Sequence, residues 1–349
     1  MTTSKNFAAR LCAWQKRNGR HDLPWQRTRD AYAIWLSEIM LQQTQVATVI
    51  PYYLRFLKRF PDVKRLAAAP LDDVLALWAG LGYYSRARNL HRAAVVIAAE
   101  HGGVFPAKFD DVVALPGVGR STAAAICVFA CGARHAILDG NVKRVLARHR
   151  GVRGFPGATK TLESLWRHAE ALLPKKDLES YTQGLMDLGA SVCARREPRC
   201  DDCPVNADCV ARARGLTAEI PAARPARVLP HRRTTMLILL HAGEVLLVKR
   251  PPSGIWGGLW SLPEIDEGEN AEDAQAVCLR RFGARASGVT TLPVVEHGFT
   301  HFKLSITPQR VRVAAMTPQV RESGAMWMTV AAALGAAIPA PVRNILISI

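Results

Sequence analysis

The chain has 349 residues, with 46 Lys and Arg against 29 Asp and Glu, so its formal net charge is +17 and its pI is about 10.0. A hydrophobic fraction of 49% excludes a disordered tail, and no apolar run approaches the ~20 residues of a membrane span. The length predicts two domains. The excess positive charge indicates a polyanionic partner, either nucleic acid or an anionic membrane surface, although an ordinary basic enzyme would also fit.

Most of that charge lies in the first two-thirds of the chain. Residues 1–230 carry 34 basic and 20 acidic residues, a net of +14, whereas residues 231–349 carry 12 and 9, a net of +3. Between these parts, residues 214–233 contain three prolines and little helical periodicity, which is typical of a linker. We therefore predict a first domain over 1–213, a linker over 214–233 and a second domain over 234–349.

The first part is predicted to be all-α, because apolar residues recur there at helical spacing. Phe7, Leu11 and Trp14 predict an N-terminal helix that belongs to the domain and is not a targeting peptide. Gly or Pro separates most of the later stretches. These predicted helices cover about 31–47, 51–60, 70–78, 86–101, 108–113, 120–131, 141–149, 160–173 and 179–193.

The second part has the alternating pattern of strands. Residues 235–240 and 244–249 flank His241-Ala-Gly243, which predicts a β-hairpin. Residues 301–306 and 309–313 predict a second strand pair, and residues 271–282 predict one helix between the two pairs. The second part is therefore expected to be α+β.

Four of the eight cysteines are grouped within 17 residues, in the pattern C-x6-C-x2-C-x5-C: Cys193, Cys200, Cys203 and Cys209. Nothing indicates secretion, so thiolates at this spacing predict a metal or cluster site and not disulfides. Zinc sites usually contain two Cys-x2-Cys pairs, and here there is one. The spacing favours a [4Fe–4S] cluster, with zinc as the alternative.

A glycine-containing turn, Leu115-Pro-Gly-Val-Gly-Arg-Ser-Thr122, lies between two predicted helices. Glycines allow a tight turn that exposes N–H groups at the start of the next helix, where a phosphate can bind. The predicted DNA-contacting residues of this turn are Pro116, Gly117, Val118 and Gly119. Some twenty residues later, Asp139 is predicted to be a helix N-cap and a carboxylate that faces a nucleotide.

Glu38 lies within Tyr32–Val46, a segment whose spacing predicts a single helix. Its carboxyl is expected at the edge of an apolar face, near Trp35 and Leu41, where poor solvation should raise its pKa enough to hold a proton near neutral pH. A protonated Glu38 and an ionised Asp139 would match the acid and the stabilising carboxylate of glycoside hydrolysis.

Three longer segments carry a family resemblance. Residues 35–51, 81–90 and 137–144 closely resemble the adenine DNA glycosylases of the MutY type, and together with the glycine turn and the cysteine loop the resemblance covers nearly all of 7–210. It implies a multi-domain protein with an all-α helix-hairpin-helix glycosylase domain and a [4Fe–4S] cluster loop. It also implies, as partner, double-stranded DNA that contains 8-oxoguanine:A or G:A mispairs.

The resemblance also implies catalytic roles. Glu38 matches the general acid that protonates adenine N7, Asp139 the carboxylate that stabilises the oxocarbenium ion, and Asn141 a residue that positions the sugar-side groups. Relatives that also cut the strand carry a Lys directly after G-V-G-R, where this sequence has Ser121. Without that amine a Schiff base cannot form there, so we expect base removal without efficient strand cleavage.

Further residues match positions that contact DNA in the family. Gln43, Leu81 and Tyr83 match residues that wedge into the duplex beside the lesion, and an exposed Tyr is a suitable stacking platform. The residues that match the adenine pocket are Trp25, Gln26 and Gln183.

The second part resembles a Nudix-type fold around Arg250–Glu264. Gly258 and Glu264 fit the first half of the metal-binding box, but the positions for its Arg and three Glu hold Glu272, Asp273, Ala276 and Val277. We therefore expect no pyrophosphate hydrolysis. In the family this domain contacts 8-oxoguanine through a Phe-Ser-His loop, which is here Phe299, Thr300 and His301.

Two other functions stay open on the sequence alone. One is a bifunctional glycosylase and lyase for damaged pyrimidines, which would need a Lys at the position of Ser121. The other is a non-enzymatic DNA- or redox-sensing module built on the cysteine site. We expect a monomer in the bacterial cytoplasm that associates with the nucleoid through DNA binding, and no membrane partner.

Overall fold

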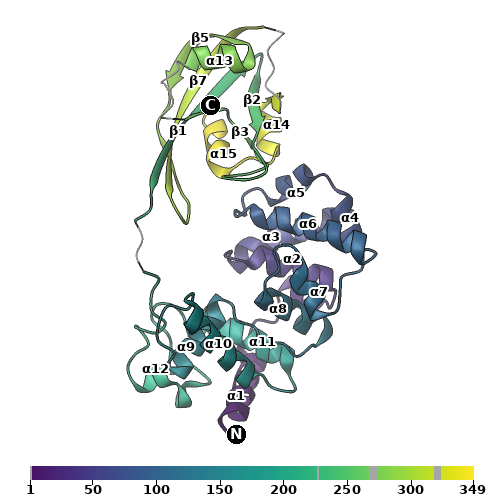
Figure 1. Ribbon diagram of the computed structural model, residues 1–349, viewed down its shortest axis with the longest axis vertical. Helices are drawn as coiled ribbons and strands as arrows, with labels where there is room; N and C mark the ends of the chain where they lie inside the picture. Colours follow the sequence, from purple (N-terminus) through teal and green to yellow (C-terminus); the bar gives the residue numbers. More distant parts are fainter. Residues whose placement is uncertain (1, 226–227, 267–273, 318–323) are drawn as a thin grey trace. The chain divides into compact units, whose positions relative to one another are not determined.

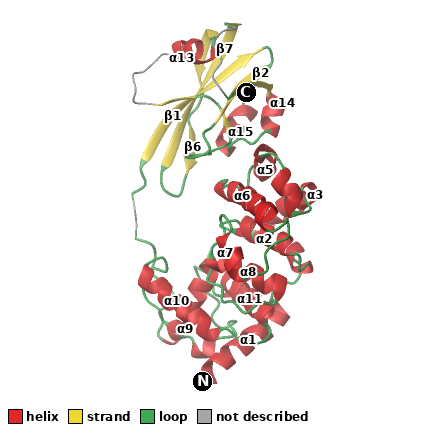
Figure 2. Cartoon of the chain, turned by 45° about the vertical axis from the view of Figure 1, so that its right-hand side comes forward, coloured by secondary structure: helices red, strands yellow, loops and turns green. Residues whose placement is uncertain are grey.

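The computed structural model describes residues 2–225, 228–266, 274–317 and 324–349. The chain forms two compact units, Met1–Ala68 with Asn89–Ala226, and Ala69–Arg88 with Arg227–Ile349. Figure 1 labels the elements, and Figure 2 shows that the strands belong to the C-terminal part of the chain. Within the described residues, no helix is both long and apolar enough to cross a membrane.

The described part of the first unit is helical, as predicted. Most of the longer helices agree with the predicted ranges, except that the predicted range 31–47 is divided between α2 and α3, and the short helices α4 and α12 were not predicted. The helices are α1 (Thr2–Asn18), α2 (Ala31–Leu41), α3 (Val46–Arg59), α4 (Val63–Ala68), α6 (Ser85–Glu100, which begins in the second unit), α7 (Phe109–Ala114), α8 (Arg120–Cys131), α9 (Gly140–Arg150), α10 (Thr159–Leu172), α11 (Leu178–Asp187) and α12 (Val210–Ala213). Shorter turns are η1 (Pro24–Arg27), the π-helical η2 (Leu188–Val192) and η3 (Asn206–Asp208).

The prediction of a single helix over Tyr32–Val46 was wrong. Helix α2 ends at Leu41, and α3 begins at Val46. The break is at Gln43, whose φ of 58° lies in the left-handed region and cannot continue an α-helix. The polar side chains after Leu41 therefore do not extend the face of α2 that carries Glu38.

Apolar faces of the helices form the core of the first unit. Phe7 and Leu11 of α1 are fully buried against α10 and α11, in one cluster with Val145 of α9 and Leu165 of α10. Helix α2 packs against α8, and its Trp35 is also fully buried. Because packed apolar faces hold α2, α9 and α11 in place, the polar residues on these helices have fixed positions.

The second unit contains a mixed sheet with strand order β3-β2-β1-β7-β5, in which β1 and β7 are parallel. The predicted hairpin is confirmed, since Leu240 of β1 pairs with Val245 of β2. Helix α13 covers the sheet through Val277 and Phe282. The described elements are α5 (Leu71–Trp78), β1 (His231–His241), β2 (Glu244–Lys249), β3 (Trp260–Ser261), β4 (Glu264–Asp266), α13 (Ala274–Phe282), β5 (Ala284–Thr291), β6 (Val295–Gly298), β7 (Lys303–Met316), β8 (Ala325–Thr329), α14 (Val330–Gly335) and α15 (Ala340–Ile347).

The predicted second strand pair, 301–306 with 309–313, was wrong, because residues 303–306 and 309–313 belong to the single strand β7, and His301 and Phe302 precede it. Pro308, which separates the two predicted strands, lies in the sheet at the point where the partner of β7 changes. Strand β6 pairs with β7 up to Ile306, and β5 pairs with it from Gln309 onward. A proline is tolerated at such a gap in the hydrogen-bond ladder. The start of the predicted helix 271–282, with Glu272 and Asp273, lies outside the described residues.

Candidate active site and cysteine loop

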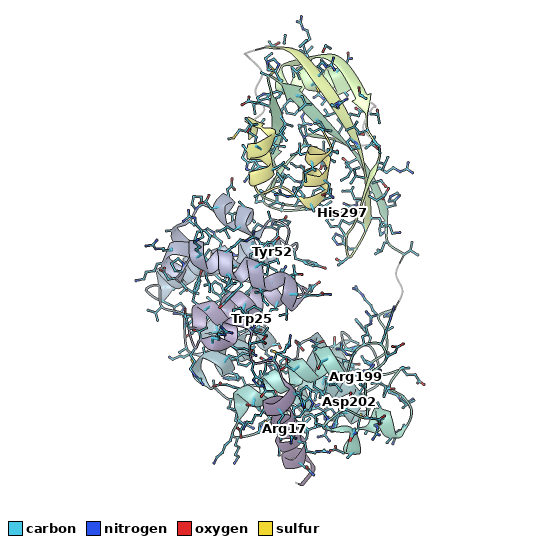
Figure 3. The ribbon with its side chains drawn as sticks, turned by 180° about the vertical axis from the view of Figure 1, so that it is seen from behind. Arg17, Trp25, Tyr52, Arg199, Asp202 and His297 are labelled. Carbon is cyan, nitrogen blue, oxygen red and sulfur yellow. The ribbon has the colours of Figure 1, made fainter. Side chains whose placement is uncertain are left out.

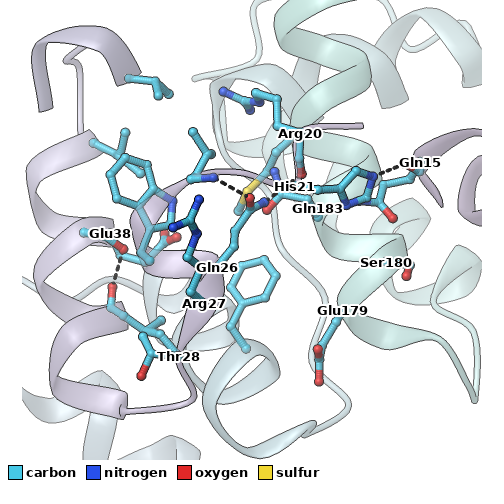
Figure 4. Close-up of a pocket in the computed structure, with 18 of the residues that line it drawn as sticks. Gln15, Arg20, His21, Gln26, Arg27, Thr28, Glu38, Glu179, Ser180 and Gln183 are labelled. Carbon is cyan, nitrogen blue, oxygen red and sulfur yellow. Dashed lines mark hydrogen bonds between the residues drawn. The ribbon is translucent and has the colours of Figure 1, made fainter. Parts of the chain in front are cut away.

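A cavity of about 550 Å³ lies between η1, α2 and α11. This volume is typical of sites for small molecules, which are ~300–1,000 Å³. The structure brings together in its wall four of the predicted site residues, which are far apart in the sequence. They are Trp25, Gln26, Glu38 and Gln183, and Figure 4 shows three of them, Gln26, Glu38 and Gln183, labelled around the cavity.

Glu38 is the acidic residue of α2 in the wall of this cavity. Apolar neighbours in the same wall include Ile34, Leu41 and Phe129. Burial, and secondly the negative charge of Asp139, raise the pKa of Glu38 from 4.5 to about 8. The predicted direction is thus confirmed, and the carboxyl holds a proton at neutral pH while it faces a space that a small molecule could enter.

Asp139 is the N-cap of α9, as predicted. Its Oδ1 accepts a hydrogen bond from the Val142 N–H at 2.7 Å. Burial raises the pKa of this carboxyl, whereas the N–H groups of Val142 and Asn141 and the charges of Arg144 and Lys143 lower it, and the net direction is upward. Capping therefore opposes the effect of burial on the pKa of Asp139 but does not cancel it.

Asn141 and Ser121 make contacts that fix the segment around Asp139. The Asn141 Oδ1 accepts a hydrogen bond at 2.9 Å from Arg144, whose Nε also donates to the Cys193 carbonyl. The Ser121 Oγ accepts a hydrogen bond at 2.8 Å from the N–H of Leu138, the residue before Asp139. Ser121 therefore connects α8 to the start of α9 through a bond that a Lys side chain could not accept.

The two predicted pocket residues of η1 differ in whether their side chains are already engaged by hydrogen bonds. Trp25 is 8% exposed and packs edge-on against Tyr53, with ring centroids 5.4 Å apart. Gln26 lines the cavity, but its Oε1 accepts from the Leu23 N–H at 3.1 Å and its Nε2 donates to the Arg20 carbonyl at 2.9 Å. Gln26 thus holds the turn before α2, while Trp25 supplies a flat apolar wall.

The cavity wall formed by α11 contains a polar network that was not predicted from the sequence. The Gln183 Nε2 donates to Asp187 at 2.9 Å, and Asp187 also accepts from the Arg20 N–H at 3.0 Å and from its Nε at 2.6 Å. The buried Asp187 therefore fixes the amide of Gln183. The only sequence signal was a polar run before Leu23-Pro24-Trp25, without helical spacing.

The glycine turn connects α7 to α8, as the sequence predicted. Gly117 has a φ of 79°, and a Cβ there would lie 2.7 Å from the Cβ of Asn89. Glycine is therefore required at this position for both its conformation and its close approach to α6. Gly119 is the N-cap of α8, whose first N–H groups follow directly.

The predicted wedge residues have unusual backbone conformations. Gln43 and Tyr83 both have positive φ, 58° and 48°, which is uncommon for residues other than glycine. Tyr83 is 44% exposed, whereas Leu81 is 5% exposed. Around Tyr83, the Arg86 guanidinium donates to the Leu81 carbonyl at 3.3 Å and lies 5.6 Å from the Tyr83 ring. This places Tyr83, and not the side chain of Leu81, in contact with solvent.

The four clustered cysteines line one cavity, together with apolar residues such as Leu188, Val192 and Val205. Within the described ranges, no three His, Cys, Asp or Glu side chains converge closely enough to chelate a single ion. Four soft thiol ligands around one cavity fit an iron–sulfur cluster. Figure 3 labels Arg199 and Asp202 on this loop, and they form an ion pair at 3.3 Å.

The cysteine loop is joined to α9 by the buried guanidinium of Arg148. This group donates to the carbonyls of Ile220 at 2.8 Å, Ala194 at 2.6 Å and Arg195 at 3.2 Å. It also lies 3.4 Å from the Cys193 Sγ. Arg148 therefore connects the helix capped by Asp139 to the backbone around the first cysteine.

In the second unit, the predicted recognition residues form the turn between β6 and β7. The Phe299 N–H donates to the Phe302 carbonyl at 2.9 Å, and the two rings stack at 4.3 Å. Thr300 and His301 are exposed at the tip, with 3.5 Å between Thr300 Oγ1 and His301 Nδ1. Glu264 forms an ion pair with Arg250.

Comparison with protein families supports the predicted two-part architecture. A family model described as "HhH-GPD superfamily base excision DNA repair protein" matches residues 36–171, and one described as "NUDIX domain" matches residues 234–348. The predicted fold class, a helix-hairpin-helix glycosylase domain followed by an α+β Nudix-like domain, is thereby confirmed.

Individual relatives match over most of the chain. The adenine DNA glycosylase of Buchnera aphidicola subsp. Acyrthosiphon pisum is 36% identical over 341 residues, which cover 97% of this chain and 96% of that protein. The adenine DNA glycosylase of Homo sapiens is 34% identical and is matched by 93% of this chain over 70% of its own length. Among solved structures, a thermostable thymine-DNA glycosylase has a TM-score of 0.56 and 29% identity, over 61% of this chain and 97% of that chain.

Proposed function

The chain belongs to the family of adenine DNA glycosylases, and on that premise we propose that it removes adenine paired with 8-oxoguanine, and with guanine, by hydrolysing the N-glycosidic bond without cutting the strand. Glu38 carries this proposal. Its carboxyl lines a cavity of suitable size and has a pKa of about 8, so it can donate a proton to a base at neutral pH.

Adenine must leave the helix stack to reach that cavity. In the proposed reaction, Glu38 donates a proton to adenine N7, which makes the base a better leaving group. The oxocarbenium ion that develops on the sugar is stabilised by the negative charge of Asp139, which the N–H groups at the start of α9 hold in place. Glu38, now ionised, then accepts a proton from the attacking water.

Ser121 supports the proposal that the strand is not cut. A lyase of this family would form a Schiff base through an amine at this position, and Ser121 has none. Its hydroxyl accepts the Leu138 N–H, so we propose a positioning role for it beside Asp139 and no covalent step. Asn141 is proposed to position the same segment through Arg144.

We propose that DNA is bound by surfaces on both units. The turn Pro116–Gly119 at the start of α8 suits a phosphate, and the strained residues Gln43 and Tyr83 suit a wedge beside the lesion. The proposed 8-oxoguanine contact is the exposed tip formed by Phe299, Thr300 and His301. In the adenine pocket, we propose that Trp25 and Gln183 touch the base, while Gln26 supports the wall.

The cysteine loop is proposed to hold a [4Fe–4S] cluster through Cys193, Cys200, Cys203 and Cys209. The shared cavity and the four thiol ligands support this. When bound, such a cluster would hold the loop in one conformation and present its arginines to DNA phosphates. A brown preparation with broad visible absorbance that acid bleaches would distinguish it from zinc.

We further propose domains over 1–213 and 234–349 joined by a linker over 214–233, and a monomer that works in the bacterial cytoplasm on DNA. The matched family ranges, 36–171 and 234–348, lie inside the two proposed domains. Size-exclusion chromatography with light scattering would test the monomer.

The function is tested on labelled duplexes with 8-oxoguanine:A, G:A and T:G pairs, which are treated with alkali after incubation. We expect alkali-dependent breaks at A in the first two duplexes, few breaks without alkali, and none with Glu38→Gln. No breaks, or equal breaks at T:G, would contradict adenine excision. Efficient trapping of a covalent DNA adduct by borohydride would instead support a bifunctional lyase.

A further inference from the structure

An aromatic cluster lies behind the exposed tip of the β6–β7 turn. The His297 ring, labelled in Figure 3, meets Phe299 edge-on, with centroids 4.7 Å apart. Trp256, from the loop between β2 and β3, lies 5.6 Å from His297 and 5.5 Å from Phe299. Burial lowers the pKa of His297, so its ring is neutral near pH 7 and packs as an aromatic group. Thr300 is therefore next to a ring that Trp256 and His297 support.

Trp256 itself is held tightly. Its φ of 53° lies in the left-handed region, and its side chain is 9% exposed. The next residue, Gly257, has no space for a side chain, because a Cβ there would lie 2.6 Å from the Pro252 carbonyl oxygen. Such a conformation persists only where the surrounding structure enforces it.

Arg250 and Glu264 hold Trp256 in this backbone conformation. The Arg250 Nε donates to the Ile255 carbonyl at 2.9 Å, and its guanidinium lies 5.7 Å from the centre of the Trp256 ring. The other side of this guanidinium forms an ion pair with Glu264, which is 23% exposed. Glu264, the carboxylate that fits the first half of a Nudix metal box, is thus used to hold an arginine under the tryptophan.

We propose that Trp256 and His297 are positioning residues for recognition of the oxidised purine, because they hold Phe299 and thereby the hydroxyl of Thr300 and the imidazole of His301 in one arrangement. This proposal rests on the proposed function. An oxidised guanine differs from guanine by an added carbonyl oxygen and an N–H, and a pair of small polar groups can read that difference only if their positions are fixed. Loss of Trp256 or His297 should therefore lower the rate of adenine excision more on the 8-oxoguanine:A duplex than on the G:A duplex.

The test compares Trp256→Ala with Trp256→Phe, and His297→Ala with His297→Phe, in the full-length protein. Single-turnover rates of adenine excision are measured on 8-oxoguanine:A and G:A duplexes, and the ratio of the two rates is the readout. We expect each Ala variant to lower the ratio about tenfold, mainly through the oxidised substrate, and each Phe variant to keep it within about threefold. Trp327→Ala, a large aromatic removed from β8 of the same sheet, is the matched control and should leave the ratio unchanged.

The outcomes separate the two proposals. If the wild-type protein excises no adenine from either duplex, the proposed function itself fails. If it does excise adenine, equal losses on both duplexes in His297→Ala and Trp256→Ala, or a loss with Trp327→Ala as large as with Trp256→Ala, would overturn the positioning role. Thermal unfolding identifies any variant that does not fold, and the His297 pair then decides the question, because His297 is only half-buried.

Discussion

At the scale of single residues, the proposed chemistry depends on the carboxyl groups of Glu38 and Asp139, because the charge of Asp139 acts on Glu38. Burial, and secondly the charge of Asp139, raise the pKa of Glu38 to about 8, and burial also raises the pKa of Asp139 against the lowering effect of its backbone N–H partners. The negative charge of Asp139 favours the protonated form of Glu38, as the proposed division between an acid and a charge stabiliser requires. The same arrangement leads to predictions for rate and for stability.

The rate of adenine excision should depend on the proton of Glu38. Since the pKa of Glu38 is about 8, we expect a plateau below that pH and a fall of about tenfold per pH unit above it. Single-turnover rates between pH 6 and 10 measure this. Glu38→Gln should remove the activity at all pH values, and a wild-type rate that stays constant up to pH 10 would contradict Glu38 as the acid.

Glu38 should also destabilise the protein at alkaline pH. Its folded-state pKa is raised, so its contribution to stability is complete below the unfolded pKa of about 4.5 and is lost as the pH rises through about 8. Glu38→Gln avoids this loss, so its thermal midpoint at pH 9 should exceed that of the wild type by roughly 2–5 °C. The difference should disappear at pH 5, and an equal difference at both values would exclude this linkage.

Asp139→Asn separates capping from charge. Asn caps a helix about as well as Asp, so the free energy of unfolding should change by less than ~0.5 kcal/mol, whereas excision should fall by at least about 100-fold. The control is Asp30→Asn at the N-cap of α2, where the side chain accepts the Tyr32 N–H. That variant should retain full activity. A similar loss in both variants would assign Asp139 a structural role.

At the scale of elements, α9 connects the two special sites of the first unit. Asp139 caps its first turn, Arg144 reaches the carbonyl of Cys193, and Arg148 holds the backbone of the cysteine loop. The first unit thus needs α9 both to hold the carboxylate whose charge acts on Glu38 and to fix the loop. A helix is suited to this because residues three and four apart lie on one face.

Arg148→Met should loosen the cysteine loop. It leaves one buried and two partly buried carbonyls without their donor, which should cost about 3 kcal/mol of unfolding free energy and lower the iron content per chain. Thermal unfolding and visible absorbance measure both effects. The control is Arg153→Met, at an exposed position just after α9. Unchanged stability and iron content in Arg148→Met would show that Arg148 does not hold the cysteine loop.

At the scale of the whole molecule, the positive charge is concentrated in the first two-thirds of the chain. Residues 1–230 carry a net charge of +14, and residues 231–349 carry +3. A surplus of positive charge gives affinity for any DNA sequence, because each neutralised phosphate releases counterions. Searching along DNA is therefore expected to depend on the first part, and selection of the lesion on the nearly neutral second part.

Binding to an undamaged duplex should weaken at least about tenfold between 50 and 200 mM salt. Arg196→Gln in the cysteine loop should reduce the slope of log affinity against log salt by about 0.9. The control is Arg310→Gln in β7, which should leave the slope unchanged, and both residues are exposed. Fluorescence anisotropy measures the affinities, and a salt-independent affinity would refute electrostatic binding.

The elements that depend on local pattern could be predicted from the amino-acid sequence. Helical periodicity located the long helices, the hairpin of β1 and β2 followed from its turn residues, and the short segment before α9 predicted Asp139 as a cap. Local sequence pattern gave wrong predictions where contacts between distant residues determine the start or end of a helix or strand. Gln43 ends α2 within a pattern that favours helix, and Pro308 lies inside β7 because the strand partner changes there.

The properties of the site residues depend on contacts between distant parts of the chain, which the sequence did not predict. The pKa of Glu38 depends on which apolar groups and which carboxylate surround it, and these come from distant parts of the chain. Likewise, Gln26 is engaged by backbone groups, Gln183 is oriented by Asp187, and Glu264 holds Arg250. Residue identity fixes which groups are present, whereas desolvation and hydrogen bonding depend on three-dimensional neighbours that no local pattern contains.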